Sequence, residues 1–160
     1  MERKTKIVAE DGKQDLLITR EFDLPVELLF KAHAEADIFE QWMSHEYGTV
    51  KVLKFEPKKY GSWQFQTGNK DGIIVLQAGG VFHEFIPYSR ITRTFEMVNS
   101  LFGVQLEFLE FESLTGDTSK LSMHCIYRSV ALRDEMLKLP FAQGLNMAHN
   151  RLQDIAGKIK

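Results

Sequence analysis

The feature that most constrains the fold is an apolar stripe near the end of the chain. Apolar residues recur there at steps of three and four, the spacing that lines one side of an α-helix; they are Phe141, Leu145, Ala148, Leu152, Ile155 or Ala156, and Ile159. Upstream, residues 16–127 read mainly as short strands broken by turn signals. One long terminal helix beside one extended sheet must bury its stripe against that sheet. The functional question is therefore whether the two meet in a solid core or around a hollow.

The region before this helix predicts an antiparallel sheet. Segments rich in β-branched and aromatic residues are strand candidates, beginning with residues 16–22 and continuing over 49–55, 61–67, 73–86, 91–95, 106–111 and 120–127. The sequence GNKDG at residues 68–72 is a strong hairpin connector, because Gly, Asn and Asp accept positive φ. Gly79 and Gly80 inside a long strand suggest a bulge or bend.

Helices are expected at four places. Pro25 stands where a first helical turn needs no N–H, Asp23 upstream is a candidate cap, and the helix covers residues 25–34. A second short helix is expected over residues 36–43, and Ser129 is a candidate N-cap for residues 130–137. The final helix begins near Pro140. No repeat or linker divides the chain, so we expect a loosely ordered segment over residues 1–15 and one domain over residues 16–160.

Composition excludes several classes of partner. With 160 residues, 44% of them hydrophobic, and a formal charge of −2, the chain has no field that would draw nucleic acid or an anionic membrane. No apolar run approaches the ~18 residues that span a bilayer, and the basic start lacks the apolar core of a secretory signal. Cys125 is the only cysteine, which fits a reducing compartment. We therefore expect a cytoplasmic protein without nucleic-acid or membrane partners.

No strong catalytic or metal-binding motif is present. His83 and Glu84 begin an H-E-x-x pattern, but Pro87 stands where the second histidine would be and the segment is a strand. The other histidines are scattered without ligand spacing. Neither a serine nucleophile elbow nor a glycine-rich phosphate-binding pattern occurs. The sequence therefore predicts no metal and no cofactor.

Glu84 is the acid most worth following, because it lies within the otherwise apolar stretch VFHEFI. Facing inward, it would be a buried acid with a raised pKa and a candidate proton donor or acceptor. Facing outward, it would meet solvent or pair with an arginine of an adjacent strand such as Arg93, and strand alternation favours this interpretation. Glu84, His83 and His124 are the weak catalytic candidates. Glu107, Glu110 and Glu112 are read mostly as a solvated face.

Several stretches together resemble a known family. They are ITREFDLPVELLFKAHAEADIFEQW, YGSWQF, GGVFHEFIPYSRITRTF, ALRDEML and GLNMAHNRLQDIA, and they cover the chain from about residue 16 to about residue 155. These stretches resemble the activator of heat-shock-protein-90 ATPase homologue (C-terminal domain) family, within the START-like, or SRPBCC, superfamily. Two departures are visible: LPF at residues 139–141 replaces the usual Ser-Gly-Met, and AEA at residues 34–36 stands where Thr-Asp-Pro is common.

The resemblance implies an α+β helix-grip fold, in which a curved antiparallel sheet of about six strands wraps around the long C-terminal helix. It also implies a cavity between them that accepts hydrophobic small molecules. Alternation and helical phase select the walls of such a cavity as Phe30, Trp42, Trp63, Phe65, Leu76, Phe82, Met123, Phe141, Leu145 and Ala148. The small Ala148 in mid-stripe leaves room on the side that faces the sheet.

Three functions are compatible with these residues. The first is binding of a small apolar or aromatic molecule without a defined catalytic site. The second is a START-like enzyme of the cyclase, aromatase or hydrolase type; it ranks lower because no matched nucleophile and base occur. The third is a co-chaperone that stimulates heat-shock-protein-90 ATPase in a stress response; it rests on the family name alone, and a shared fold does not establish function. A homodimer formed through a free strand edge is also compatible.

Overall fold

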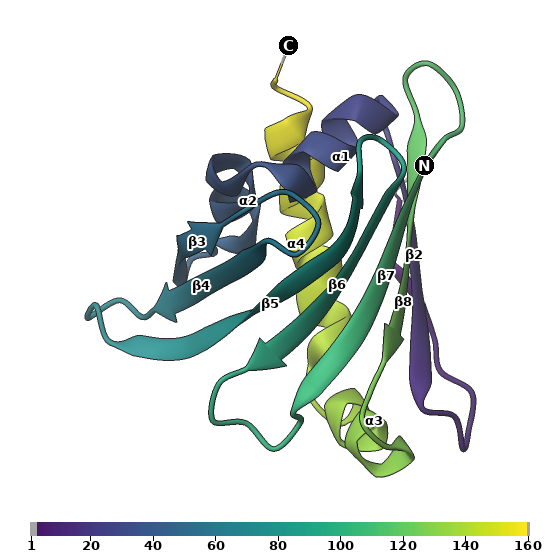
Figure 1. Ribbon diagram of the computed structural model, residues 1–160. Coiled ribbons are helices and arrows are strands. Elements are labelled where there is room, and N and C mark those ends of the chain that lie inside the picture. The colour runs from purple at the N-terminus through teal and green to yellow at the C-terminus, as the bar shows by residue number, and fades with distance from the viewer. Residues whose placement is uncertain (1–2, 160) are drawn as a thin grey trace.

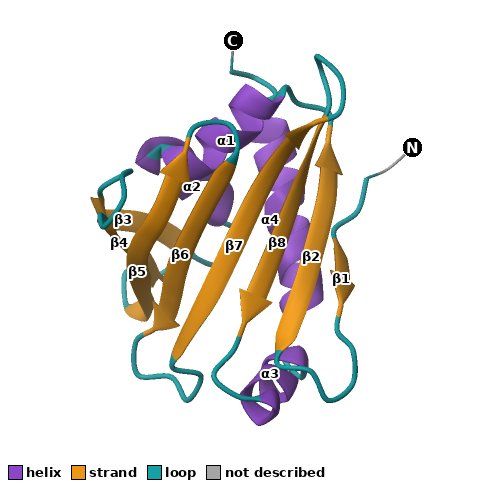
Figure 2. Ribbon diagram, turned by 45° about the vertical axis from the view of Figure 1, so that its right-hand side comes forward, coloured by secondary structure: helices purple, strands orange, loops and turns teal. Residues whose placement is uncertain are grey.

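A computed structural model describes residues 3–159, which form one open antiparallel sheet and four helices (Figures 1 and 2). Strands β1 to β8 are Lys6–Val8, Asp15–Phe22, Thr49–Phe55, Ser62–Gly68, Ile74–Ile86, Arg90–Met97, Val104–Ser113 and Ser119–Ile126. Helices α1 to α4 are Val26–Ala34, Ala36–Met43, Val130–Leu137 and Phe141–Ala156. The strand order is β1-β2-β8-β7-β6-β5-β4-β3, so β2 joins the last strand and the sheet runs on by hairpins to β3.

The predicted α+β helix-grip fold is confirmed, but the predicted number of strands, about six, is too low for this eight-stranded sheet. Part of the difference is β1, which pairs with β2 where we expected the loosely ordered segment over residues 1–15. Thr5 just before it donates its backbone N–H to the Asn146 side chain of α4 at 2.9 Å. Three residues are too few to show an alternating pattern. The partner strand, rather than the local sequence, makes this segment a strand.

The stripe on α4 is used in two different ways along its length. Figure 1 shows α4 crossing one face of the sheet, with α1 and α2 beside its C-terminal half and α3 near its beginning. Ala148 at the middle of the helix, and Leu152 and Ala156 in its C-terminal half, are buried. Phe141 and Leu145 in the first half are only half-buried. One end of the helix therefore closes a solid core, and the other end does not.

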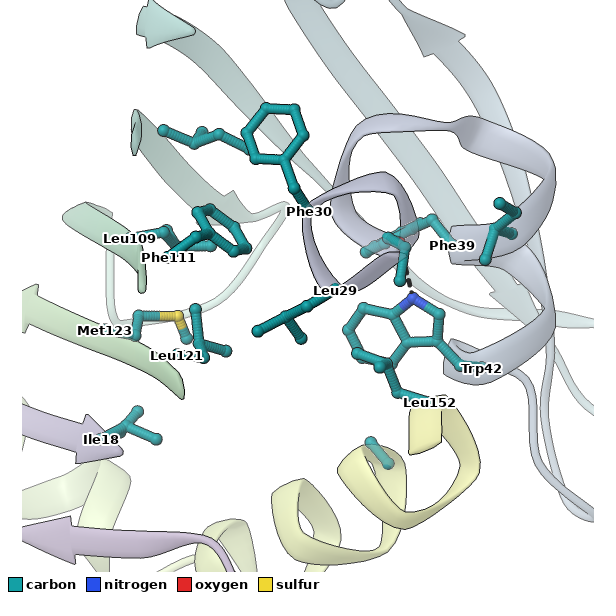
Figure 3. Close-up of a cluster of buried hydrophobic side chains, with 14 of the residues drawn as sticks. Ile18, Leu29, Phe30, Phe39, Trp42, Leu109, Phe111, Leu121, Met123 and Leu152 are labelled. Atoms are coloured by element: carbon teal, nitrogen blue, oxygen red, sulfur yellow. Dashed lines mark hydrogen bonds between the residues drawn. The ribbon is translucent and has the colours of Figure 1, made fainter. Parts of the chain in front are cut away.

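The solid core lies where α1 and α2 meet the sheet. Figure 3 shows side chains of these helices and Leu152 of α4 facing inward-pointing residues of β2, β7 and β8. Trp42 is held in this core because its Nε1 donates to the backbone oxygen of Ala32 at 2.8 Å, the dashed line in Figure 3. Phe30 packs edge-on against Phe85 and Phe111. Aromatic pairs of this geometry add to the stabilisation from burial.

The two predicted helix caps have different outcomes. The Ser129 side chain accepts the backbone N–H of Leu132 at 3.1 Å, so the predicted cap of α3 is confirmed. The predicted Asp23 cap is wrong, because α1 begins one residue after Pro25 and Asp23 lies too far upstream. Its carboxylate pairs with Arg3 instead, at 3.1 Å.

An irregularity in β5 decides which way its side chains point. At Gly80 a Cβ atom would lie 2.0 Å from the carbonyl oxygen of Thr94, so this glycine allows close approach of two strands. The register shift with β6 falls later, between Phe82 and Glu84. Residues two apart normally share a face, but an extra residue in one strand breaks that alternation. Phe82 consequently points into the core and Glu84 lies on the outer face of the sheet.

Candidate functional site

A cavity of about 470 Å³ lies between the sheet and the first half of α4. Five strands and all four helices of the described chain contribute to it, and its apolar walls are Ile18, Phe39, Trp42, Met43, Trp63, Phe65, Phe95, Met97, Met123, Cys125, Met136, Leu139, Pro140, Phe141 and Leu145. Four of these residues are methionines, whose flexible thioethers adapt to irregular shapes. The walls are therefore apolar, aromatic and adjustable.

The structure brings together six of the ten predicted wall residues. These six are Trp42, Trp63, Phe65, Met123, Phe141 and Leu145. Phe30, Phe82 and Ala148 are instead buried in the packed core, and Leu76 on β5 is half-buried away from the cavity. Alternation and helical phase identify which residues point inward, but they do not separate residues that line a hollow from those that pack against each other.

Sequence reasoning missed a polar cluster on the sheet side of the cavity. Arg93 of β6 and Glu107 of β7 are directly opposite each other in the register, and Arg93 Nε donates to Glu107 Oε1 at 2.8 Å. Gln105 Nε2 donates to Glu107 Oε2 at 2.7 Å. The predicted solvated face is therefore wrong for Glu107, which is 5% exposed. Its period-two relation to the buried Leu109 and Phe111 is the signal that could have found it.

Two buried histidines on the helices line the cavity, and both rings lie near Trp42. The ring centroids of His33 and His149 lie 5.2 and 6.4 Å from that of Trp42. His33 Nδ1 lies 2.9 Å from the Leu29 carbonyl oxygen and must donate to it, while His149 Nδ1 lies 2.7 Å from Thr5 Oγ1. Burial lowers the pKa of His33 to about 4 and that of His149 to about 3. Both rings are therefore neutral at neutral pH.

The three weak catalytic candidates lie away from this cavity. Glu84 and His124 line a larger groove of about 890 Å³ on the outer face of the sheet, here called the outer groove, with Val8, Glu10, Lys13, Asp15, Leu17, Arg90, Phe108, Glu110 and Ser122. His83 is exposed beside the ring of Tyr60. An inward-facing Glu84, the condition for a buried acid, is thus not observed.

Glu84 and His124 of the outer groove each have a partner on the protein. Glu84 accepts from Thr92 Oγ1 at 2.6 Å and from Arg90 Nη1 at 3.3 Å. The hydrogen bond from Thr92 and the charge of Arg90 lower the pKa of the Glu84 carboxyl. Arg93, the partner expected from the sequence, is on the opposite face. His124 Nε2 lies 2.6 Å from Asp15 Oδ2.

Within residues 3–159, no group of three or more His, Cys, Asp or Glu side chains is arranged to hold a metal ion. In the same part of the chain, no helix has the length and apolar character needed to cross a bilayer.

Comparisons with known proteins agree with this architecture. The family model described as "Activator of Hsp90 ATPase homolog 1-like protein" matches residues 23–157. A solved structure from Rhodobacter sphaeroides is similar with a TM-score of 0.88 at 18% identity, covering 98% of this chain and 99% of that one. Protein Ms6760 from Mycobacterium smegmatis has a TM-score of 0.84 at 15% identity over 95% and 96% of the two chains. No curated protein matches the sequence. At these identities, the structural likenesses show the fold alone.

Proposed function

Since the chain belongs to the activator of Hsp90 ATPase homolog 1-like family, we propose that it binds a small hydrophobic or aromatic molecule in the cavity between the sheet and α4. The observation that carries this proposal is an apolar hollow of about 470 Å³ next to a packed core. Ligand pockets fall in the range of roughly 300–1,000 Å³. A molecule in this hollow would cover apolar surface that the fold itself leaves uncovered, which favours binding of an apolar ligand.

The rim of the cavity supports entry of an apolar molecule. Leu139 and Pro140 in the connection between α3 and α4 line the cavity and are exposed to solvent, Leu139 by 48%. Phe141 beside them is half-buried. This is the LPF segment that departs from the family pattern, so selectivity at the entrance is expected to be particular to this chain.

Catalysis receives less support than binding, because Glu84, His83 and His124 all lie away from the cavity. The cytoplasmic location, the homodimer and the stress-response role stay predictions. No surface within residues 3–159 specifically supports binding to a chaperone, and we do not propose a chaperone partner.

A thermal-shift screen with flavonoids, polyketides and fatty acids tests the proposed function. A ligand present at 100 times its Kd stabilises by about 2.7 kcal/mol, which raises the Tm of a domain this size by roughly 5–10 °C. Absence of any shift across the three classes would contradict the proposal.

A matched pair of variants locates the site. Leu145→Trp places a larger ring in the cavity wall and should weaken binding at least about tenfold, since one tenfold step needs only ~1.4 kcal/mol. Leu17→Trp adds the same ring to the outer groove and should leave affinity unchanged. Equal affinities of the two variants in a titration would place the ligand elsewhere.

A further inference from the structure

The two tryptophans of the chain both line the cavity, but their indole nitrogens are used differently. Trp42 Nε1 donates to the Ala32 carbonyl. Trp63 Nε1 is buried and has no hydrogen-bond partner within residues 3–159. A buried donor left unpaired costs about 1–3 kcal/mol. Trp63 lines the cavity although this nitrogen is closed to water, so a ligand that shifts a neighbouring side chain can supply the missing acceptor.

The ring of Trp63 is held firmly, so its N–H has a defined direction. The ring stacks on Phe65 and Phe82, with centroids 5.8 and 6.0 Å away. The guanidinium carbon of Arg93 lies 4.4 Å from the centroid of the Trp63 ring. Only 2% of Trp63 is exposed. This donor is therefore oriented in advance, which reduces the entropy lost when a ligand binds.

Arg93 brings further donors to the same wall. Its Nε donates a hydrogen bond to Glu107, but its two terminal nitrogens make no hydrogen bond to residues of the described chain. The stacking of Arg93 on Trp63 places these nitrogens next to the indole. The hydroxyl of Tyr127, also in the cavity wall, makes no hydrogen bond to described residues, and burial raises its pKa so that it keeps its proton. Unused donors are therefore grouped on the sheet side of the cavity.

The charges on this wall already cancel. Arg93 and Glu107 form one ion pair with side chains 9% and 6% exposed, and both carboxylate oxygens accept a hydrogen bond. An ionised ligand would add a buried charge without a counter-charge, which is strongly unfavourable. A neutral acceptor can use the free donors without that cost.

We propose that the ligand is a mostly apolar molecule with a neutral carbonyl oxygen, and that this oxygen accepts hydrogen bonds from Trp63 Nε1 and the terminal nitrogens of Arg93. The inference rests on the proposed ligand-binding function and specifies its chemistry. The Tyr127 hydroxyl is a third donor within the same cavity. The body of the molecule packs on the aromatic and methionine walls.

Three naphthalenes of similar shape test this specificity. Titration calorimetry of the full chain at neutral pH would compare 2-acetylnaphthalene, which has a carbonyl, with 2-ethylnaphthalene, which has none, and with the anion 2-naphthoate. Hydrogen bonds to charged donors contribute about 1.5–3 kcal/mol, so the acetyl compound should bind at least roughly tenfold more tightly than the ethyl compound. The naphthoate should bind more weakly than the acetyl compound.

Two matched substitutions assign the preference to one indole. Trp63→Phe keeps an aromatic ring but removes the free N–H, and should reduce the acetyl-to-ethyl preference roughly 2- to 13-fold, the factor that one neutral hydrogen bond contributes. Tyr60→Phe removes a polar group from an exposed aromatic ring outside the cavity. It should leave both the affinity and the preference unchanged. The comparison of ligands on the unmodified chain needs neither variant to fold.

The outcomes separate this inference from the proposed function. Equal binding of the ethyl and acetyl compounds overturns the carbonyl inference and leaves apolar ligand binding intact. Tighter binding of 2-naphthoate overturns the neutral acceptor in favour of an anion. A Trp63→Phe chain with an unchanged preference removes Trp63 from the site. If none of the three compounds binds, and the thermal-shift screen is also blank, both the inference and the proposed function are rejected.

Discussion

The sheet has a hollow on each face, and the two differ in chemistry more than in size. The outer groove is the larger, at about 890 Å³, but its Glu84 and His124 already have partners on the protein. The inner cavity is about 470 Å³, with apolar walls and an indole N–H of Trp63 that no described residue accepts. The comparison teaches that unused hydrogen-bonding capacity beside apolar surface, rather than volume, marks the candidate site.

Strand β8 contributes to both hollows. Ser122 and His124 line the outer groove, whereas Met123 and Cys125 line the inner cavity. Neighbouring residues on this strand therefore lie in two different environments, because successive side chains point to opposite faces of the sheet. Substitutions can therefore be matched closely across the sheet.

The largest difference is expected between the two ion pairs. Glu107→Gln removes the only carboxylate within residues 3–159 that is bonded to the buried Arg93 guanidinium, and should cost about 3–5 kcal/mol in the free energy of unfolding. Glu84→Gln removes a carboxylate from the exposed outer pair, where solvent screens the attraction, and should cost much less. Urea unfolding of both variants measures the difference. Similar losses would show that the two faces are not electrostatically distinct.

The second-largest effect is expected at acidic pH, where the two buried histidines of the cavity should lower the free energy of unfolding. Burial lowers the pKa of His33 to about 4, against the opposing effect of its hydrogen bond to Leu29, and the charge of Arg93 adds to the shift. Burial lowers the pKa of His149 to about 3, and the charge of Arg20 adds to that shift. Because the unfolded rings take up protons near pH 6.5 and the folded rings do not, stability falls as pH drops below that value. The expected loss is roughly 2 kcal/mol per histidine between pH 7 and pH 5.

Urea midpoints at pH 7 and pH 5 measure this loss. His149→Gln should remove about half of it. Asp15→Asn in the outer groove removes a carboxyl whose pKa is lowered mainly by its hydrogen bond with the half-buried His124, and should leave most of the acid sensitivity in place. An unchanged pH dependence in His149→Gln would contradict the assignment to the buried rings.

The smallest expected effect concerns thiol reactivity on the two faces of β8. Burial raises the pKa of the Cys125 thiol, with the Glu107 charge adding to the shift, and only the thiolate reacts. A cysteine introduced by Ser122→Cys in a Cys125→Ala background faces the outer groove. At pH 8 it should react with a disulfide reagent at least about tenfold faster than Cys125, since each pKa unit changes the thiolate fraction tenfold. Equal rates would mean that the inner wall is open to solvent.

Local elements were the most predictable part of the molecule. The stripe from Phe141 to Ala156 is a helix, and Ser129 caps α3, as expected from short-range patterns. The short strand β1 was missed because only pairing with β2 makes it a strand. Six cavity residues were predicted, while Arg93 and Glu107 were not, since their burial depends on mutual pairing across two strands. Polar residues that satisfy each other inside a protein look like surface residues in a sequence.

The sequence by itself determined the order of the elements and which side of each one is apolar, because helical period and strand alternation are properties of neighbouring residues. The family resemblance added the curl of the sheet. Only the tertiary structure decided that Leu152 fills a core while Leu145 lines a hollow, and that a register shift turns Glu84 outward. These outcomes depend on how segments distant in sequence pack together. The same packing leaves the N–H of Trp63 without an acceptor among the described residues and directs attention to a ligand.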